Sequence, residues 1–490
     1  MVFSSVEFIY FFLPAAIFGH FILPKRYKNT WLFLTGLIFY SFGEPIWALL
    51  LLLSCIINYS AGLIINKYEG NAKKRRAALI CDVILNLAML CIFKYTGFIV
   101  GVINDLTGLN LPLNIYAGLS NAVLGTHFSL DAIVLPIGIS FFTFQSMSYT
   151  VDLYMGNIEV QKSFIDFAAF VTCFPQIVAG PIVKYRDIDS ELRQRKVLAT
   201  GFSEGVSRFA RGLGKKVLLA NNIGLLWESV READYSSMPA LTAWLGIIAF
   251  TFQIYFDFSG CSDMAIGMGK MLGFTFPENF NLPYLSKSVR EFWRRWHITL
   301  GEWFKSYVYI PLGGSKNGMA KTIRNLLVVW FLTGLWHGAS FNFILWGLWF
   351  GLLIILERLF LGNFLNKIPP VFSWLYTMLA VIFGWVMFDT RSLSLAAGFF
   401  GAMFGAGGRL YDSETLWLFC EYSLTISLCI FFAFGAHIGL KEKVQAAIER
   451  AGLKISIFEV IEPVAALMLL IASTAYIINM DYNPFLYFNF

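Results

Sequence analysis

Apolar residues follow one another along this chain in long runs, interrupted by short polar or basic stretches. A helix that crosses a membrane needs about 20 mostly apolar residues. Some runs are too short or too polar to cross, and we expect these to be re-entrant or interfacial, which leaves about 10–13 true crossings. The runs predict helices at roughly 6–23, 30–42, 46–66, 77–101, 131–154, 163–183, 205–227, 239–258, 322–338, 341–361, 370–388, 394–406, 415–438 and 459–480.

The composition supports a membrane protein. Only 14% of the 490 residues are charged, whereas 57% are hydrophobic and 17% are aromatic. An ordinary soluble domain carries about 25% charged residues, so this chain cannot cover a water-facing surface of its size. The same composition excludes intrinsic disorder, collagen and a disulfide scaffold. We expect an all-α polytopic membrane protein and, because no internal repeat or low-complexity linker occurs, a single domain over residues 1–490.

The basic residues lie mostly in short loops between the apolar runs, and the formal net charge is +6. Loops rich in Lys and Arg remain in the cytoplasm. We therefore expect loops 67–76, 184–196 and 287–324 on the cytoplasmic side, and residues 102–130, which contain no Lys or Arg, on the outer side. This pattern makes membrane lipids the expected partners and argues against nucleic-acid binding. No spacing of Cys or His predicts a metal site.

The block 276–347 contains the densest basic stretch and the most unusual residues. From about Ser288 to residue 304 the pattern predicts one amphipathic helix. Its apolar face carries Phe292, Trp296, Leu300, Trp303 and Phe304, and its polar face carries Arg290, Arg294, His297 and Gly301. Two interpretations remain open: an interfacial helix with arginines on lipid phosphates, or a cationic wall for an anionic ligand.

His337 lies between two apolar runs, in the stretch 333–340. An ionisable side chain inside a membrane segment is a candidate functional residue, and imidazole suits proton abstraction near neutral pH. Small neighbours, including Gly334 and Gly338, predict open space around the ring. The alternative is a core histidine bonded to a neighbouring helix. The other three histidines, His20, His127 and His437, are expected to be structural or incidental.

Two apolar segments contain residues that typically interrupt helices. Residues 259–262, Ser-Gly-Cys-Ser, predict a break between Asp257 and Asp263. These carboxylates are six positions apart and cannot share a helix face, so we expect them to be structural or to line a cavity. Residues 174–181, with two prolines and one glycine, predict a second broken helix that lines a cavity.

Several long motifs carry a family resemblance. They are MVFSS (1–5), FPQIVAGPI (174–182), YFDFSGCSDMAIG (255–267), EFWRRWHITLGEWFKSYVYIPLGG (291–314), LTGLWHGASFNFILWG (332–347) and YNPFLYFNF (482–490). Through them the sequence resembles, nearly end to end, the membrane-bound O-acyltransferase (MBOAT) superfamily, in its bacterial branch of alginate and peptidoglycan O-acetyltransferase-like proteins. The resemblance implies a ring of helices around a thin central wall and a tunnel, with the catalytic block at about 276–347.

The resemblance also implies a reaction. The invariant family histidine maps onto His337 and a second histidine onto His297, both catalytic. A thioester donor, acetyl-CoA or an acyl-carrier thioester, would bind from the cytoplasm without any bound cofactor. The expected donor-binding residues are Arg290, Arg294, Arg295 and Trp336.

The expected destination of the acyl group is outside the cell. The resemblance implies an extracytoplasmic SGNH-type partner that receives the group and acylates a cell-envelope polysaccharide, with this chain in the bacterial plasma (inner) membrane. Two alternatives remain open: D-alanyl transfer from a carrier protein to teichoic acid, and a transporter or flippase. A transporter often shows inverted repeats, and none is found here.

The chain ends in the aromatic motif 482–490. Its pattern Phe485-x-Tyr487-x-x-Phe490 resembles a C-terminal motif of acyl-transfer proteins in this superfamily, which implies that the Tyr487 hydroxyl carries the acyl group. Docking of a partner and simple anchoring at the interface remain alternatives.

Overall fold

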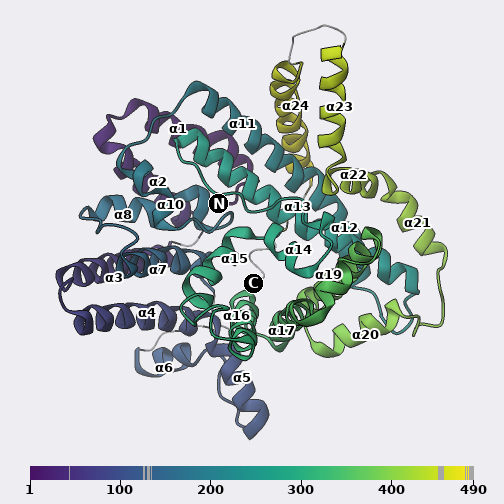
Figure 1. The fold of residues 1–490 in the computed structure, drawn as a ribbon, viewed down its shortest axis with the longest axis horizontal. Helices are drawn as coiled ribbons and strands as arrows, with labels where there is room; N and C mark the ends of the chain where they lie inside the picture. The colour runs from purple at the N-terminus through teal and green to yellow at the C-terminus, as the bar shows by residue number, and fades with distance from the viewer. Residues whose placement is uncertain are drawn as a thin grey trace.

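All regular elements in the described part of the chain are helices (Figure 1). The computed structural model describes residues 1–43, 45–124, 127, 129, 133, 135–450, 457–480, 482 and 484. The N-terminal helices are α1 (Leu13–Ile22), α2 (Lys28–Ser41), α3 (Trp47–Lys67), α4 (Ala72–Lys94), α5 (Thr96–Thr107), α6 (Ile115–Leu124), α7 (Ile139–Met155), α8 (Phe164–Val171), α9 (Phe174–Ile177) and α10 (Tyr185–Arg193).

The remaining helices form the centre and the C-terminal part. The central helices are α11 (Ala199–Gly214), α12 (Asn221–Arg231), α13 (Ala240–Leu272), α14 (Val289–Arg295), α15 (Ile298–Phe304) and α16 (Met319–His337). The C-terminal helices are α17 (Phe341–Leu356), α18 (Gly362–Leu365), α19 (Pro370–Asp389), α20 (Leu393–Met403), α21 (Ser413–Glu421), α22 (Ser423–Ala433), α23 (Ala436–Arg450) and α24 (Phe458–Asn479).

The helices confirm an all-α polytopic membrane protein. Among the described residues, six helices are long and apolar enough to cross a membrane: α3, α4, α13, α17 with its extension to Leu365, α19 and α24. The pair α21 and α22, bent by 57°, would make a seventh. The expected 10–13 crossings also require shorter or more polar helices, so that number stays a prediction.

The predicted break between Asp257 and Asp263 is wrong. Helix α13 continues through this stretch without interruption and ends at Leu272. The next residue, Gly273, has a φ of 86°, which is typical of a glycine that follows a helix C-terminus. The glycine has a packing role instead. A Cβ on Gly260 would lie 2.7 Å from the Gly212 carbonyl oxygen, and one on Gly212 would lie 2.6 Å from that of Gly260. Small residues therefore let α11 and α13 approach backbone to backbone, as is common in membrane helix pairs.

Both carboxylates of α13 form ion pairs with the neighbouring helical run. Asp263 lies 2.6 Å from Lys215 Nζ and 2.7 Å from an Arg208 guanidinium nitrogen. Asp257 lies 2.5 Å from Lys216 Nζ, and both of these side chains are buried. Lys215 and Lys216 lie on a π-helical turn, Lys215–Ala220, that joins α11 to α12. These pairs support the structural role expected of the two aspartates.

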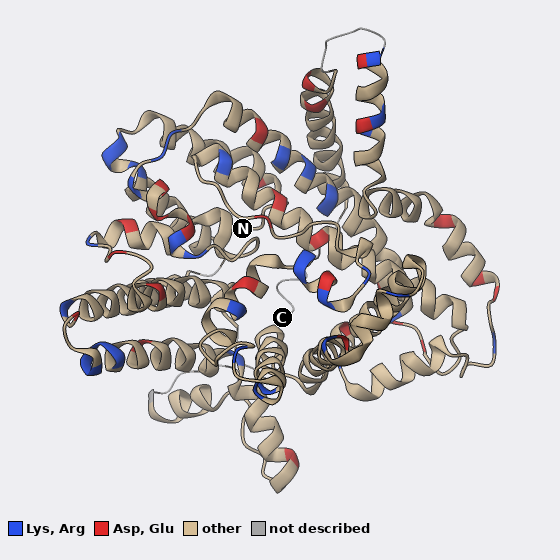
Figure 2. Cartoon of the chain, in the orientation of Figure 1, with Lys and Arg blue, Asp and Glu red and all other residues tan. Residues whose placement is uncertain are grey.

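The short helices α14 and α15 lie at the centre of the fold together with α16. Helices α3, α4, α7 and α8 lie on one side of them in Figure 1, and α17, α19 and α20 lie on the other. The basic residues of the loop between α3 and α4 gather at the tip of that hairpin, away from the centre (Figure 2). The catalytic block predicted at about 276–347 therefore occupies the middle of the protein.

Candidate active site

The segment 289–304 is not one helix. Helix α14 ends at Arg295 and α15 begins at Ile298, and His297 between them has a left-handed φ of 44°. This break overturns the predicted single amphipathic helix, because it turns His297 away from the arginine face. The His297 side chain is buried, with 2% of its surface exposed. Helix α15 is anchored on α7 by a parallel stack of Trp303 on Phe144, with centroids 3.7 Å apart.

Asn279 holds the His297 ring. The His297 Nδ1 atom lies 3.1 Å from Asn279 Oδ1, and the same oxygen accepts hydrogen bonds from the Thr299 amide and hydroxyl. Since the Thr299 amide can only donate, Asn279 Oδ1 is an acceptor and His297 Nδ1 carries the proton. His297 Nε2 is then unprotonated and can accept a hydrogen bond, and it has no partner among the described residues. Sequence patterns gave no sign of this partnership.

His337 is the last residue of α16 and is 5% exposed. The expectation that small neighbours leave space around its ring is wrong. The glycines face α17 instead: a Cβ on Gly334 would lie 2.4 Å from the Phe343 carbonyl oxygen, and one on Gly338 would lie 2.1 Å from the Phe343 ring. The imidazole itself packs against the rings of Trp346 and Phe388, at 4.8 and 5.2 Å between centroids.

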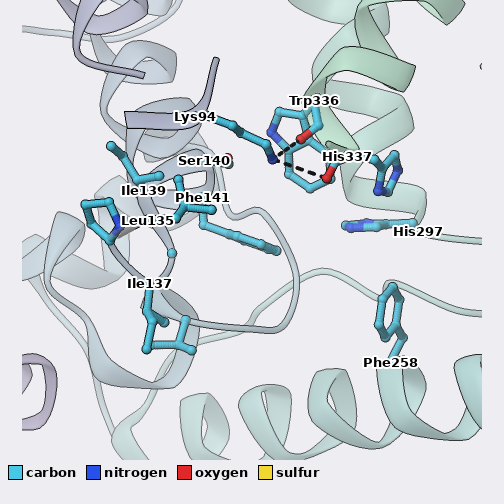
Figure 3. A pocket seen from close by; sticks show the side chains of 13 residues that line it. Lys94, Leu135, Ile137, Ile139, Ser140, Phe141, Phe258, His297, Trp336 and His337 are labelled. Atoms are coloured by element: carbon cyan, nitrogen blue, oxygen red, sulfur yellow. Dashed lines mark hydrogen bonds between the residues drawn. The ribbon is translucent and has the colours of Figure 1, made fainter. Parts of the chain in front are cut away.

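Open space lies on another side of the two histidines, in a cavity of about 50 Å³ (Figure 3). A cavity of this size holds a few water molecules. His297, Trp336 and His337 line it together with Phe258 of α13, Val178, the segment 135–141 and Lys94. Lys94 lies at the end of α4 and donates hydrogen bonds to the backbone of α16. The structure thus brings together the two predicted catalytic histidines and Trp336, and adds Lys94.

A second hollow lies on the other face of the broken segment. This cleft has a volume of about 880 Å³, and five basic side chains but one acidic side chain line it among the described residues. Arg290 and Arg294 are among them, as predicted for donor binding; the others are Lys305, Lys316, Arg358 and Glu302. Arg295 does not line the cleft, because it pairs with Glu291 at 2.9 Å and donates to the Asn281 carbonyl.

A third hollow adjoins the histidine cavity on the side of the N-terminus. It measures about 470 Å³, and residues Met1 to Glu7 and the end of α2 contribute to its lining. Ile137 and Val178 line both this pocket and the histidine cavity. The segment from 174 to 181 is broken after the short helix α9, as predicted, and it contributes Val178 to the wall between them. The tunnel implied by the family resemblance stays a prediction.

Most of the C-terminal motif lies outside the described residues. Tyr487 lies outside the described residues, so its predicted role as acyl carrier stays a prediction. Two earlier residues of the motif are described. The Tyr482 hydroxyl lies 3.4 Å from Gln253 Nε2, and the Pro484 carbonyl accepts a hydrogen bond from Lys216. The tail therefore reaches α13 near Asp257, which adjoins the cavity residue Phe258 in sequence.

Comparison with known proteins identifies relatives over the whole chain. The family model described as membrane-bound O-acyltransferase matches residues 35–397. A probable alginate O-acetylase AlgI of Pseudomonas aeruginosa is 40% identical over 408 residues, which cover 83% of this chain and 75% of that protein. The protein of the same name from Pseudomonas putida is 37% identical and covers 100% of both chains. A peptidoglycan O-acetyltransferase of Helicobacter pylori is 31% identical, over 100% of this chain and 98% of that protein.

Asn279 gives a first test of the site. We expect Asn279→Ala to lower acyl-transfer turnover at least about tenfold, because His297 Nδ1 loses the acceptor that fixes the orientation and tautomer of its ring. Ser262→Ala is the matched control, since Ser262 contacts the Asn279 amide nitrogen and not its oxygen. Turnover and thermal stability are measured for both variants. Equal turnover in the two folded variants would show that the bond to His297 has no role in the reaction.

Proposed function

The chain belongs to the membrane-bound O-acyltransferase family and is a multi-pass membrane O-acyltransferase, and from this premise we propose that it carries an acetyl group across the bacterial plasma membrane. The donor is a cytoplasmic thioester, acetyl-CoA or an acyl-carrier thioester. The recipient is an extracytoplasmic SGNH-type partner, which acetylates a cell-envelope or extracellular polysaccharide. The observation that best supports this proposal is the single cavity that contains both imidazoles, with a basic cleft on the other face of the same segment.

The reaction is proton transfer coupled to acyl transfer. His337 removes the proton from an acceptor hydroxyl, whose oxygen forms a bond to the thioester carbonyl carbon. The carbon–sulfur bond then breaks, and the proton passes to the leaving sulfur to give a free thiol. His297 is the second imidazole in the cavity, and Ile298, its neighbour in sequence, lines the donor cleft.

The donor binds in the basic cleft. Coenzyme A carries phosphates, and arginine binds phosphate through two parallel hydrogen bonds. Arg290 and Arg294 are exposed in the cleft, where their charges are available to such a ligand. The Trp336 indole N–H is buried and has no partner among the described residues, which supports a role in holding an oxygen of the donor near the histidines. Arg295 does not contribute to donor binding, because it pairs with Glu291 and donates to the Asn281 carbonyl.

The acceptor in the cavity is the Tyr487 hydroxyl. Pro484 contacts Lys216, the ion-pair partner of Asp257, and Phe258 lines the cavity. Tyr487 follows Pro484 by three residues, and three residues of extended chain reach at most about 10 Å. A tyrosyl ester is also activated enough to pass its acyl group to a further hydroxyl, because phenol, with a pKa of about 10, is a better leaving group than an alcohol.

The first test of this function concerns His337. We expect His337→Gln to reduce acetyl transfer from acetyl-CoA by about 10²–10⁴-fold, the usual contribution of a general base. His437→Gln is the control, since His437 is half-buried beside Phe432 and does not line the cavity. Transfer is measured with purified protein in a bilayer, with radiolabelled acetyl or D-alanyl donors compared. A folded His337→Gln variant with near-normal turnover contradicts the assignment.

A second test concerns the donor cleft. Arg294→Gln should raise the KM for acetyl-CoA about tenfold with little change in kcat, because one charge-assisted bond to phosphate is lost. Its KM should also depend less on salt than that of the wild type. Arg295→Gln, the adjacent arginine outside the cleft, is the matched control. If both variants show the wild-type salt dependence, α14 does not bind the donor.

A third test separates the possible roles of the tail. Tyr487→Phe keeps the ring and removes the hydroxyl, so a carrier role predicts complete loss of glycan acetylation with normal folding and partner binding. Tyr482→Phe is the control, because its hydroxyl makes only long contacts, at 3.4 and 3.5 Å. Mass spectrometry of the C-terminal peptide should detect the acetylated tyrosine in wild type. An active Tyr487→Phe variant would leave docking or anchoring as the role of the motif.

A further inference from the structure

The C-terminal end of α16 lies beside the reaction cavity, and its backbone is fully bonded. An α-helix leaves its last four carbonyl groups without partners inside the helix. In a membrane protein such groups must be satisfied by the protein itself or by water in a cavity. In α16 they belong to Gly334, Leu335, Trp336 and His337. The Gly338 amide donates to the first of them, at 3.3 Å.

The end of α4 supplies partners for the other three. The Tyr95 hydroxyl donates to the Leu335 carbonyl at 2.7 Å. Lys94 Nζ donates to the Trp336 carbonyl at 2.5 Å and to the His337 carbonyl at 3.3 Å (Figure 3). The residue that carries the proposed base is therefore fixed through its own carbonyl by a lysine from a distant helix.

Lys94 also brings a charge that is not needed to satisfy these carbonyl groups. Tyr95 shows that a neutral hydroxyl can satisfy a carbonyl of this turn, and a lysine at the end of a membrane helix is more costly than a neutral donor. Among the described residues that line the cavity, no carboxylate occurs, and the titratable groups are Lys94, His297 and His337. No ion pair joins Lys94 to a carboxylate in the part of the chain that the structure describes.

We infer that Lys94 is a positioning residue that holds His337 in place and keeps the cavity positive, so that the imidazole stays neutral and a negative oxygen is favoured in front of it. The inference rests on the proposed function. When the acceptor hydroxyl gives its proton to His337 and its oxygen bonds to the acyl carbon, negative charge develops on the carbonyl oxygen before the carbon–sulfur bond breaks. In its protonated form, Lys94 at the edge of a small, largely apolar cavity opposes protonation of the base and favours that charge.

Lys94→Gln separates the charge from the hydrogen bonds, because its amide keeps an N–H donor. We expect kcat to fall at least about tenfold and the acid limb of the kcat profile to move up by about one pH unit, since imidazole accepts a proton more readily once the cation is gone. Activity should recover in part at higher pH. Tyr95→Phe is the matched control: it removes one bond to the same turn without changing the charge, and its acid limb should be that of the wild type.

A second measurement reports the protonation of the His337 imidazole independently of turnover. The rate at which diethyl pyrocarbonate modifies His337 is followed against pH by peptide mass spectrometry, with His437 as internal reference. The pH of half-maximal modification should rise in Lys94→Gln, and in Lys94→Met if the glutamine variant does not fold. An unchanged midpoint, or an equal rise in Tyr95→Phe, overturns the inference. Absence of acyl transfer in the wild type would instead contradict the proposed function and leave this measurement valid.

Discussion

A backbone or charged group inside a membrane must find its partner within the protein, and much of this structure follows from that requirement. The end of α16 is the clearest case, since Lys94 and Tyr95 of a distant helix bond three of its last carbonyls. Asn279 satisfies the break at His297 in the same way. In both places a helix ends or is interrupted in the interior of the protein, away from bulk water, and side chains complete its hydrogen bonds. The interruptions then become the places where chemistry is possible, because they bring polar side chains into the interior.

The three hollows are connected through shared lining residues and neighbouring segments. The basic cleft and the histidine cavity lie on different faces of the segment around His297, and the cavity shares Ile137 and Val178 with the pocket near the N-terminus. Trp293 and Trp330, with ring centroids 4.9 Å apart, both line the cleft, and Trp293 also contacts Trp346, the neighbour of His337. Trp293 and Trp346 therefore form a chain of aromatic contacts from the basic cleft to the ring of His337.

The apolar pattern predicted the helical class and the positions of many helices, such as 46–66 for α3 and 341–361 for α17. It failed where packing overrides local preference. The Ser-Gly-Cys-Ser stretch at 259–262 continues a helix because Gly260 meets Gly212 of α11, a contact that no local pattern reveals. The prediction of one continuous helix through His297 failed for the opposite reason. A regular helical period is interrupted there, and the interruption is bonded to Asn279, which precedes His297 by 18 positions. Lys94 could have been identified from the sequence. It is the one lysine inside the predicted run 77–101, and an ionisable side chain inside a membrane segment is the criterion that identified His337.

The left-handed backbone at His297 has a consequence for which side chains this position accepts. For residues other than glycine this conformation costs roughly 1–2 kcal/mol, and Asn, Asp and His adopt it several times more often than most others. A carboxylate there would be buried in a cavity without a water shell, which disfavours Asp. Backbone conformation and burial together thus favour histidine and asparagine among polar side chains at residue 297, before any demand of catalysis applies. Stability is given up locally to hold one imidazole in place, so selection for a more stable enzyme and selection for a more active one oppose each other at this residue.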